Sequence, residues 1–256
     1  MDREHGLFGS FSSWSEAMQY YAGDPDYFLE KVKEATLKVK SGEAAFERDS
    51  VLFDKIQHSY PLLAYLLMIA TEHGNKLNVL DLGGSLGSSY FQCRGFLKHL
   101  NEIKWNIVEQ EHYVACGRKY IQDEILKFYY SIDECVAAGR PHTAILSGVL
   151  LALDDPYAYL YKLMDSGFDY IIIDRTPFLP AEDRLTLYVI PPYIHESITP
   201  VWLLSLERFL SVVGEKYEVM DDFDSFESYP LEDGLVAQAK GFLLRKIPAA
   251  PKRKKT

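Results

Sequence analysis

The chain has 256 residues and a formal net charge of −10, because 27 Lys and Arg residues stand against 37 Asp and Glu residues. This acidic balance disfavours a polyanionic partner such as DNA or RNA. The one basic cluster, residues 252–255, is typical of a solvated tail. The apolar fraction of 48% suffices for a core, and no apolar run approaches the ~18 residues that cross a bilayer.

The 3 cysteines show no C-x-x-C spacing, and the N-terminus lacks the apolar stretch of a signal peptide. An odd number of cysteines without a disulfide pattern is typical of the reducing cytoplasm. The sequence therefore predicts a cytoplasmic protein that uses neither a membrane nor a nucleic acid as a partner.

Residues 1–75 are predicted to form a helical extension. Asp24 and Pro25 are an N-cap and a first-turn proline, and Gly42 can end the helix that they begin. A second helix is expected over residues 50–74, with Pro61 kinking or dividing it. Such an extension would be either a lid over a ligand or a contact between the subunits of a homodimer.

Short apolar runs alternate with amphipathic stretches from residue 76 onward. The runs cover residues 77–82, 104–110, 126–131, 142–147 and 168–174. Because parallel strands require helical crossovers, this alternation predicts an α/β, doubly wound parallel sheet.

The last third of the chain predicts a different ending. An irregular stretch is followed by a helix over residues 200–214, and then by two strands, 215–223 and 241–247, that a polar loop connects. Without a crossover helix these two strands should be antiparallel. We therefore expect a domain over residues 76–247 and a disordered tail over residues 248–256.

The turn after the first strand has a composition suited to a ligand. The strand ends at Asp81, and Gly83, Gly84 and Gly87 follow within six residues. This turn lacks the glycine spacing of the dinucleotide fingerprint, and a negative charge at Asp81 would disfavour a pyrophosphate. An acidic residue beside a glycine turn suits a cationic nucleoside better.

The second strand also ends at a carboxylate, Glu109, which lies 22 residues beyond Gly87. An acidic residue at about this distance binds ribose hydroxyls in nucleotide folds. We therefore expect Asp81 and Glu109 to face a common cavity. The alternative is that Glu109 caps the next helix and that Asp81 binds backbone amides.

The stretch "VLDLGGSLG" resembles the first motif, D-x-G-x-G-x-G, of class I S-adenosylmethionine-dependent methyltransferases, with Ser85 in the middle glycine position. The stretches "FERDSVLFD", "WNIVEQ", "DDPYAYL", "IIIDRTPF" and "VWLLSLERFL" further resemble a bacterial group of predicted methyltransferases often associated with surface-polysaccharide gene clusters. The resemblance implies a Rossmann-like, seven-stranded methyltransferase sheet, mostly parallel with an antiparallel last strand, and S-adenosyl-L-methionine as the cofactor.

The resemblance also implies a set of cofactor-binding residues. The loop after the first strand would hold the methionine part and the ribose, Glu109 the ribose hydroxyls, residues 131–133 the adenine, and the end of the fourth strand the sulfonium. Ser85 should fit the loop if its φ is negative. The full set is Asp81, Gly83, Gly84, Ser85, Gly87, Glu109, Gln110, Asp133, Ser147 and Gly148.

Candidates for catalysis follow the fifth strand. Methyl transfer depends on positioning the acceptor, and a hydroxyl acceptor also needs a base. His195 and Tyr193 are candidates for that proton transfer. Arg175 could bind an anionic substrate; alternatively it forms an ion pair with Asp174, Glu182 or Asp183. The 7 histidines include no H-x-x-x-H pair, so no metal site is predicted.

Three functions stay open from the sequence. The first is methyl transfer from S-adenosylmethionine to a hydroxyl or amine of a small molecule or sugar. The second keeps the cofactor but attacks its aminocarboxypropyl arm, by intramolecular cyclisation or by transfer of that arm, and releases methylthioadenosine. The third is a non-catalytic binding scaffold with the same fold.

Overall fold

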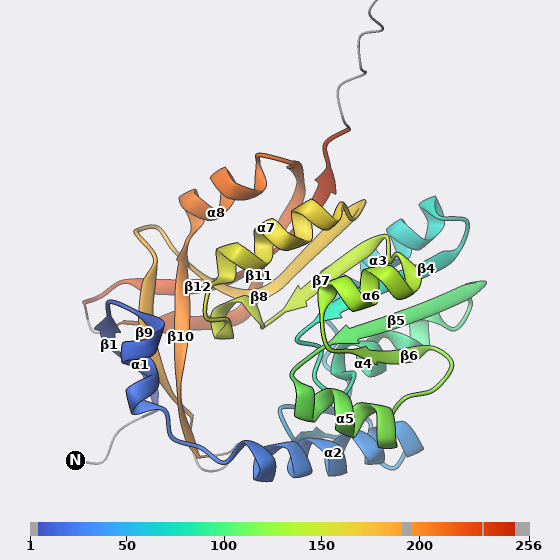
Figure 1. Ribbon diagram of the computed structural model, residues 1–256, viewed down its shortest axis with the longest axis horizontal. Coiled ribbons are helices and arrows are strands. Elements are labelled where there is room, and N and C mark those ends of the chain that lie inside the picture. The colour runs from blue at the N-terminus through green and yellow to red at the C-terminus, as the bar shows by residue number, and fades with distance from the viewer. Residues whose placement is uncertain (1–4, 191–195, 232, 249–256) are drawn as a thin grey trace, which may run out of the picture.

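The computed structural model describes residues 5–190, 196–231 and 233–248, and a ten-stranded sheet lies at its centre (Figure 1). All five strands expected between residues 76 and 174 are confirmed. They are β4 (Lys76–Leu82), β5 (Glu102–Val108), β6 (Leu126–Tyr129), β7 (Thr143–Ser147) and β8 (Tyr170–Leu179). They are parallel and lie side by side in the order β6-β5-β4-β7-β8. Their carboxyl ends therefore meet along one edge of the sheet.

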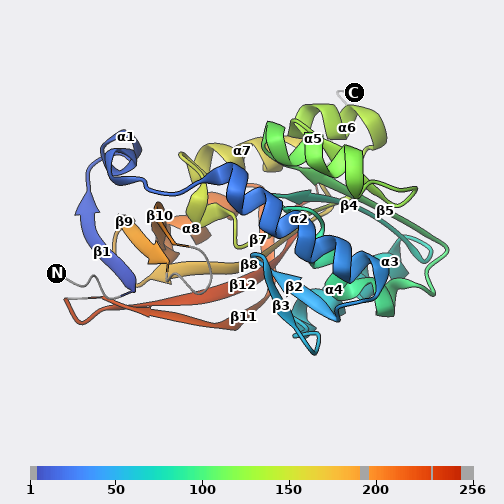
Figure 2. The ribbon, with the colours of Figure 1, turned by 90° about the horizontal axis from the view of Figure 1, so that it is seen from below.

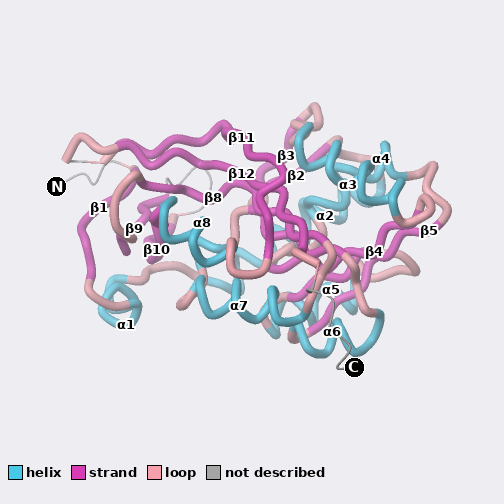
Figure 3. The backbone as a smooth tube through the Cα atoms, turned by 90° about the horizontal axis from the view of Figure 1, so that it is seen from above, coloured by secondary structure: helices cyan, strands magenta, loops and turns pink. Residues whose placement is uncertain are grey.

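Helices cover both faces of these strands, as a parallel sheet requires. The helices are α3 (Tyr60–Glu72), α4 (Ser88–Leu97), α5 (Glu111–Tyr120), α6 (Ile132–Gly139) and α7 (Pro156–Ser166), with a short 3₁₀ turn, η2 (Leu150–Ala152), before α7. One buried cluster joins α3, α4 and α5 to the sheet, and a second cluster joins α6 and α7 to its other face. Figure 3 shows α3 and α4 on the opposite side of the strands from α6 and α7. None of the described helices combines the length and apolar character needed to span a membrane.

The C-terminal strands confirm the predicted antiparallel ending. β11 (Tyr217–Pro230) pairs with β12 (Val236–Lys246), and β12 pairs antiparallel with β8. Seven strands thus lie in the order β6-β5-β4-β7-β8-β12-β11, with β12 antiparallel to both of its neighbours.

Three further strands make the sheet larger than predicted. They are β1 (Gly6–Phe11), β9 (Arg184–Ile190) and β10 (Ser197–Ser205), and they extend the sheet beyond the end of β8. The prediction of one helix over residues 200–214 was wrong in its first half, since α8 (Leu206–Val213) begins only after Ser205. A short apolar stretch such as residues 200–205 can form a helix or a strand. Here it forms a strand, because it pairs antiparallel with β9.

The N-terminal segment is not purely helical. After α1 (Trp14–Ala17) and η1 (Met18–Tyr20), α2 (Pro25–Ser41) begins and ends as predicted, with Asp24 Oδ1 accepting from Tyr27 N at 3.0 Å and with Gly42 at a φ of 84°. β1 belongs to the main sheet. The division of the chain at residue 75 stays a prediction.

The helix expected over residues 50–74 was also wrong in its first half. β2 (Phe46–Arg48) and β3 (Val51–Phe53) form a hairpin there, which lies between α2 and α4 (Figure 2). Its two turn residues, Asp49 and Ser50, have φ angles of 50° and 71°. A two-residue hairpin turn of type I′ requires a positive φ at both positions. Pro61 lies in the first turn of α3, where proline is tolerated, and so it does not kink the helix.

Candidate active site

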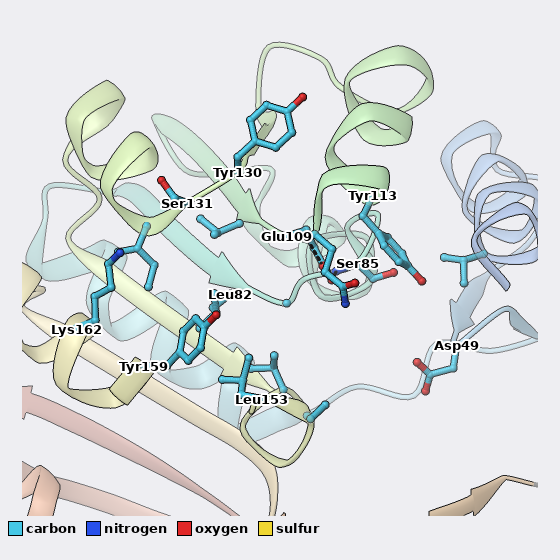
Figure 4. Close-up of a pocket in the computed structure, with 18 of the residues that line it drawn as sticks. Asp49, Leu82, Ser85, Glu109, Tyr113, Tyr130, Ser131, Leu153, Tyr159 and Lys162 are labelled. Atoms are coloured by element: carbon cyan, nitrogen blue, oxygen red, sulfur yellow. Dashed lines mark hydrogen bonds between the residues drawn. The ribbon is translucent and has the colours of Figure 1, made fainter. Parts of the chain in front are cut away.

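A cavity of about 530 Å³ opens at the carboxyl ends of β4, β5, β6 and β7 (Figure 4). This volume lies within the usual range for sites that bind small molecules. Phe28 and Val32 of α2 and Asp49 of the β2–β3 turn form its wall opposite the sheet. Of the predicted cofactor-binding residues, five line the cavity: Gly83, Ser85, Glu109, Gln110 and Gly148.

The loop after β4 has the tight backbone that its glycines predict. Gly83 has a φ of 68°, and a Cβ on it would lie 2.3 Å from Val149 Cγ2. Gly87, at a φ of 108°, is the N-cap of α4. The condition that we set for Ser85, a negative φ, is not met, because its φ is 52°. A non-glycine residue in this region costs about 1–2 kcal/mol, and such strain is characteristic of functional loops.

Glu109 fixes this loop against the end of β5. Its Oε1 accepts from the backbone N–H of Ser85 at 3.3 Å, and its Oε2 accepts from that of Gln110 at 2.7 Å (Figure 4). Burial raises the pKa of Glu109 above its ordinary value. The half-buried carboxylate still lines the cavity, so it has lone pairs available to a ligand.

Asp81 does not face the cavity, contrary to our expectation of two acidic side chains around one ligand. Its side chain is 1% exposed, and its Oδ2 accepts from Trp105 Nε1 at 2.8 Å. A Cβ on Gly84 would lie 2.6 Å from this carboxyl group, so Asp81 packs beneath the loop at Gly84. Burial raises the pKa of Asp81 to about 7. Asp81 therefore supports the loop, and Glu109 is the acidic residue that reaches the cavity.

The far end of the cavity follows β6, as the resemblance implied. Tyr130, Ser131 and Ile132 line it. Asp133 does not, because it lies on the exposed side of α6, where its Oδ2 pairs with Lys162 Nζ at 2.8 Å. Successive helical residues point about 100° apart, so Ile132 and Asp133 cannot face the same side. Lys162 itself lines the cavity.

Two smaller cavities continue from the first along the edge of the sheet. One of about 70 Å³ contains Ser147 and shares Asp49, Gly83 and Ser85 with the first cavity. Another of about 180 Å³ adjoins it through three shared residues, Arg48, Asp174 and Arg175. We call this third space the side cavity. The three cavities are thus neighbours along this edge of the sheet, since each shares lining residues with the next.

Arg175 lines both of the smaller cavities, and it forms the ion pair that we gave as an alternative, but with a partner that we did not foresee. Its Nε contacts Glu227 Oε1 of β11 at 2.9 Å, whereas Asp183 pairs with Arg208. Arg175 has a φ of 52° and is a further strained residue, inside β8 at the point where its pairing with β12 shifts register. The other catalytic candidates, Tyr193 and His195, lie outside the described residues.

Several lining residues could not be found from the sequence. Phe28, Arg48 and Asp49 precede the nucleotide-binding strands, and no local motif connects them to the glycine loop. The signal for the hairpin was the Asp-Ser pair between short apolar runs, which we interpreted as a helix start. In the described ranges, no three His, Cys, Asp or Glu side chains come together in a way that could hold a metal ion.

Comparison with known proteins identifies the fold. No family model matches the chain, and no curated protein does. The N-terminal domain of EvdMO1, solved in the presence of SAH and D-fucose, aligns with a TM-score of 0.50 and 14% identity over 88% of this chain and 97% of that one. A SAM-dependent methyltransferase from Methanosarcina mazei aligns with a TM-score of 0.50 and 9% identity over 75% of this chain and 100% of that one. The chain thus has the fold of S-adenosylmethionine-dependent methyltransferases.

Proposed function

We propose that the chain is an S-adenosylmethionine-dependent methyltransferase that acts on a hydroxyl or amine of a small molecule or sugar. The observation that supports this most directly is Glu109, whose carboxylate lines the cavity opposite the glycine loop and holds Ser85 N–H at 3.3 Å. In open α/β sheets, ligands bind outside the carboxyl ends of the strands.

The lining residues fit the parts of this cofactor. The free lone pairs of Glu109 would accept from the two ribose hydroxyls. Tyr130 and Ile132 offer apolar contacts for an adenine ring, and Ser131 offers a hydroxyl beside them. Tyr113 and Tyr159 also line the cavity, and aromatic faces attract a sulfonium. Bound in this way, the cofactor would supply an electrophilic methyl group.

The remaining chemistry depends on where the acceptor lies. The side cavity adjoins the glycine loop through the small cavity, which allows an acceptor to approach without displacing the adenosine part. Holding two reactants at near-attack distance supplies much of the rate in such a displacement. Asp174, whose pKa is raised by burial, lines both of the smaller cavities and offers a carboxylate for the acceptor's proton. His195 and Tyr193 stay proposals for the same role.

We further propose that α2 is the lid of the site, as the lid interpretation of the N-terminal segment predicted. Phe28 and Val32 line the cavity from this helix, and Val32 is 1% exposed. Apolar side chains at this position would exclude water from the sulfonium. The homodimer interpretation of the same segment stays a prediction.

Isothermal titration calorimetry of the full chain with S-adenosylmethionine and S-adenosylhomocysteine tests the cofactor. Glu109→Gln should weaken binding by about 2 kcal/mol, because it removes the charge from the hydrogen bonds to the ribose. That loss corresponds to roughly 30-fold in Kd. Glu111→Gln is the matched control, since Glu111 is exposed on α5 and does not line the cavity.

Product analysis then separates the three functions. S-adenosylhomocysteine released in the presence of an acceptor supports methyl transfer, whereas methylthioadenosine supports attack on the aminocarboxypropyl arm. Absence of any heat at millimolar ligand would favour the scaffold and contradict both enzymatic proposals.

A further inference from the structure

Two arginines that lie far apart in the sequence face the same side cavity. Arg48 ends β2 and Arg175 lies in β8, yet both line the side cavity of about 180 Å³ and the small cavity beside the glycine loop. An arginine is charged at any physiological pH, so the two side chains bring two permanent positive charges to one enclosed space.

Most of the carboxylates around this space already have partners, and one of them, Glu227, is paired with Arg175 itself. Asp224 pairs with Lys240 at 2.6 Å, and Asp174 Oδ1 accepts from the backbone of Arg175 at 2.8 Å and from Ser225 at 3.0 Å. Glu227 contacts the Nε of Arg175. The remaining acidic residue of the small cavity, Asp49, is exposed at the hairpin turn.

Arg48 has no ion pair with any described residue. Its guanidinium stacks over the ring of Phe46 at 5.5 Å, a contact that leaves its N–H donors free. Both burial and the neighbouring charge of Arg175 lower the pKa of Arg48. The carboxylates of Glu227, Asp49 and Asp174 act in the opposite direction, but none of them forms a direct ion pair with Arg48. An anionic ligand bound directly to the guanidinium would therefore lower the cost of its partial burial.

Arg175 links this space to the cofactor cavity. A Cβ on Gly148 would lie 3.5 Å from Arg175 Nη1, and Gly148 lines the large cavity. Since the ion pair with Glu227 uses Nε, the terminal nitrogens of Arg175 make no hydrogen bond with another described residue.

Buried polar atoms without partners surround the same space. Three of them are Glu47 Oε2, His58 Nδ1 and Glu227 Oε2, and none has a hydrogen-bond partner in the described part of the chain. His58 and Glu227 line the side cavity, and Glu47 is 1% exposed beside Ser88 of the small cavity. Buried polar groups are normally satisfied, so orphaned atoms at a cavity wall indicate a polar ligand. Because two of these atoms are carboxylate oxygens, which accept hydrogen bonds, they fit a donor on that ligand, such as an amine or hydroxyl beside its anionic group.

We propose that Arg48 and Arg175 form an anion site that binds the carboxylate or phosphate group of a ligand beside the glycine loop. Two sources share this chemistry: the carboxylate of the cofactor's own methionine part, and an acidic group on the methyl acceptor. The proposal rests on the proposed function only in naming these two sources.

The first experiment compares two ligands that differ in one arm. S-adenosylhomocysteine carries the aminocarboxypropyl group, and methylthioadenosine lacks it. Both are titrated calorimetrically into the wild-type chain, Arg48→Met and the control Arg140→Met, which removes the same charge from an exposed residue before β7. If the site holds the cofactor, Arg48→Met weakens S-adenosylhomocysteine by about tenfold or more and leaves methylthioadenosine unchanged.

The second experiment tests the acceptor. Inorganic phosphate, malonate and the neutral sugar glucose are titrated into the chain saturated with S-adenosylhomocysteine. If the site holds the acceptor, phosphate or malonate binds, Arg48→Met loses that binding by about tenfold or more, and Arg140→Met retains it. Arg48→Lys should be intermediate in either experiment, because it keeps the charge but not the two-pronged geometry. The unfolding midpoint of Arg48→Met, compared with that of the wild type, reports whether loss of Arg48 disturbs folding.

The proposal is overturned if Arg48→Met and the wild type bind every one of these ligands equally. If the adenosine compounds do not bind at all, the proposed function fails, and the anion titrations are repeated on the unliganded chain. Loss of phosphate or malonate binding in Arg48→Met would then still support the anion site, whereas equal binding, or no binding to the wild type, would overturn it.

Discussion

Replacing the buried carboxyl group of Asp81 by an amide should change how the stability of the protein depends on pH. The Asp81 side chain is 1% exposed, and burial raises its pKa from 3.8 to about 7. Since one pKa unit corresponds to ~1.4 kcal/mol, ionising Asp81 in the folded chain costs on the order of 4 kcal/mol. Asp81→Asn cannot ionise and keeps an oxygen that can accept from Trp105 Nε1.

The sign follows from proton binding. The folded state holds the proton of Asp81 more tightly than the unfolded state, so its stabilising contribution is complete below pH 3.8 and is lost as the pH rises to about 7. Between pH 5 and pH 8, the free energy of unfolding of Asp81→Asn should therefore rise by about 2–3 kcal/mol relative to the wild type.

Urea denaturation at pH 5, 6, 7 and 8 measures this difference. Asp133→Asn is the control, because Asp133 is exposed and its variant should follow the wild type at every pH. If the curves of Asp81→Asn and the wild type stay parallel, the carboxyl group is not desolvated as the structure indicates. Asp81→Asn should also retain cofactor binding better than Glu109→Gln, since only Glu109 lines the cavity.

Three further predictions concern the loop and its carboxylate. Gly83→Ala should destabilise the chain by about 2–4 kcal/mol in urea denaturation, because the new Cβ would collide with Val149 and because Gly83 has a positive φ. If the collision contributes, adding Val149→Ala recovers part of that loss. Ser85→Gly should keep the free energy of unfolding within about 1 kcal/mol of the wild-type value, since it relieves backbone strain. It should also retain cofactor affinity in calorimetry, since it keeps the backbone N–H that Glu109 binds. A large loss of affinity would show that the Ser85 hydroxyl binds the cofactor. Cofactor affinity of the wild type should fall as the pH is lowered, because protonation of Glu109, whose pKa is raised, removes its charge; Glu109→Gln should show no such fall.

The parallel half of the sheet could be predicted because its signals are local. The strands from β4 to β8 are largely buried apolar runs, and two of the crossover helices have a capping side chain in the sequence, Ser131 before α6 and Asp155 before α7. The glycine loop and Glu109 were found for the same reason, since strand ends and turn residues are visible in a few consecutive letters.

Tertiary structure alone decided the rest. Residues 46–53 and 200–205 are short segments whose sequence permits helix or strand, and strand pairing together with packing against other elements settles which forms. The same holds for Asp81 and Glu109: both lie at the same edge of the sheet, but Asp81 is enclosed at the end of β4 by Trp105 and Gly84, whereas Glu109 follows the last residue of β5 and lines the cavity. The orientation of Asp81 and the meeting of Arg48 with Arg175 depend on non-local packing, because side chains acquire their burial and their charged neighbours only when separate segments come together.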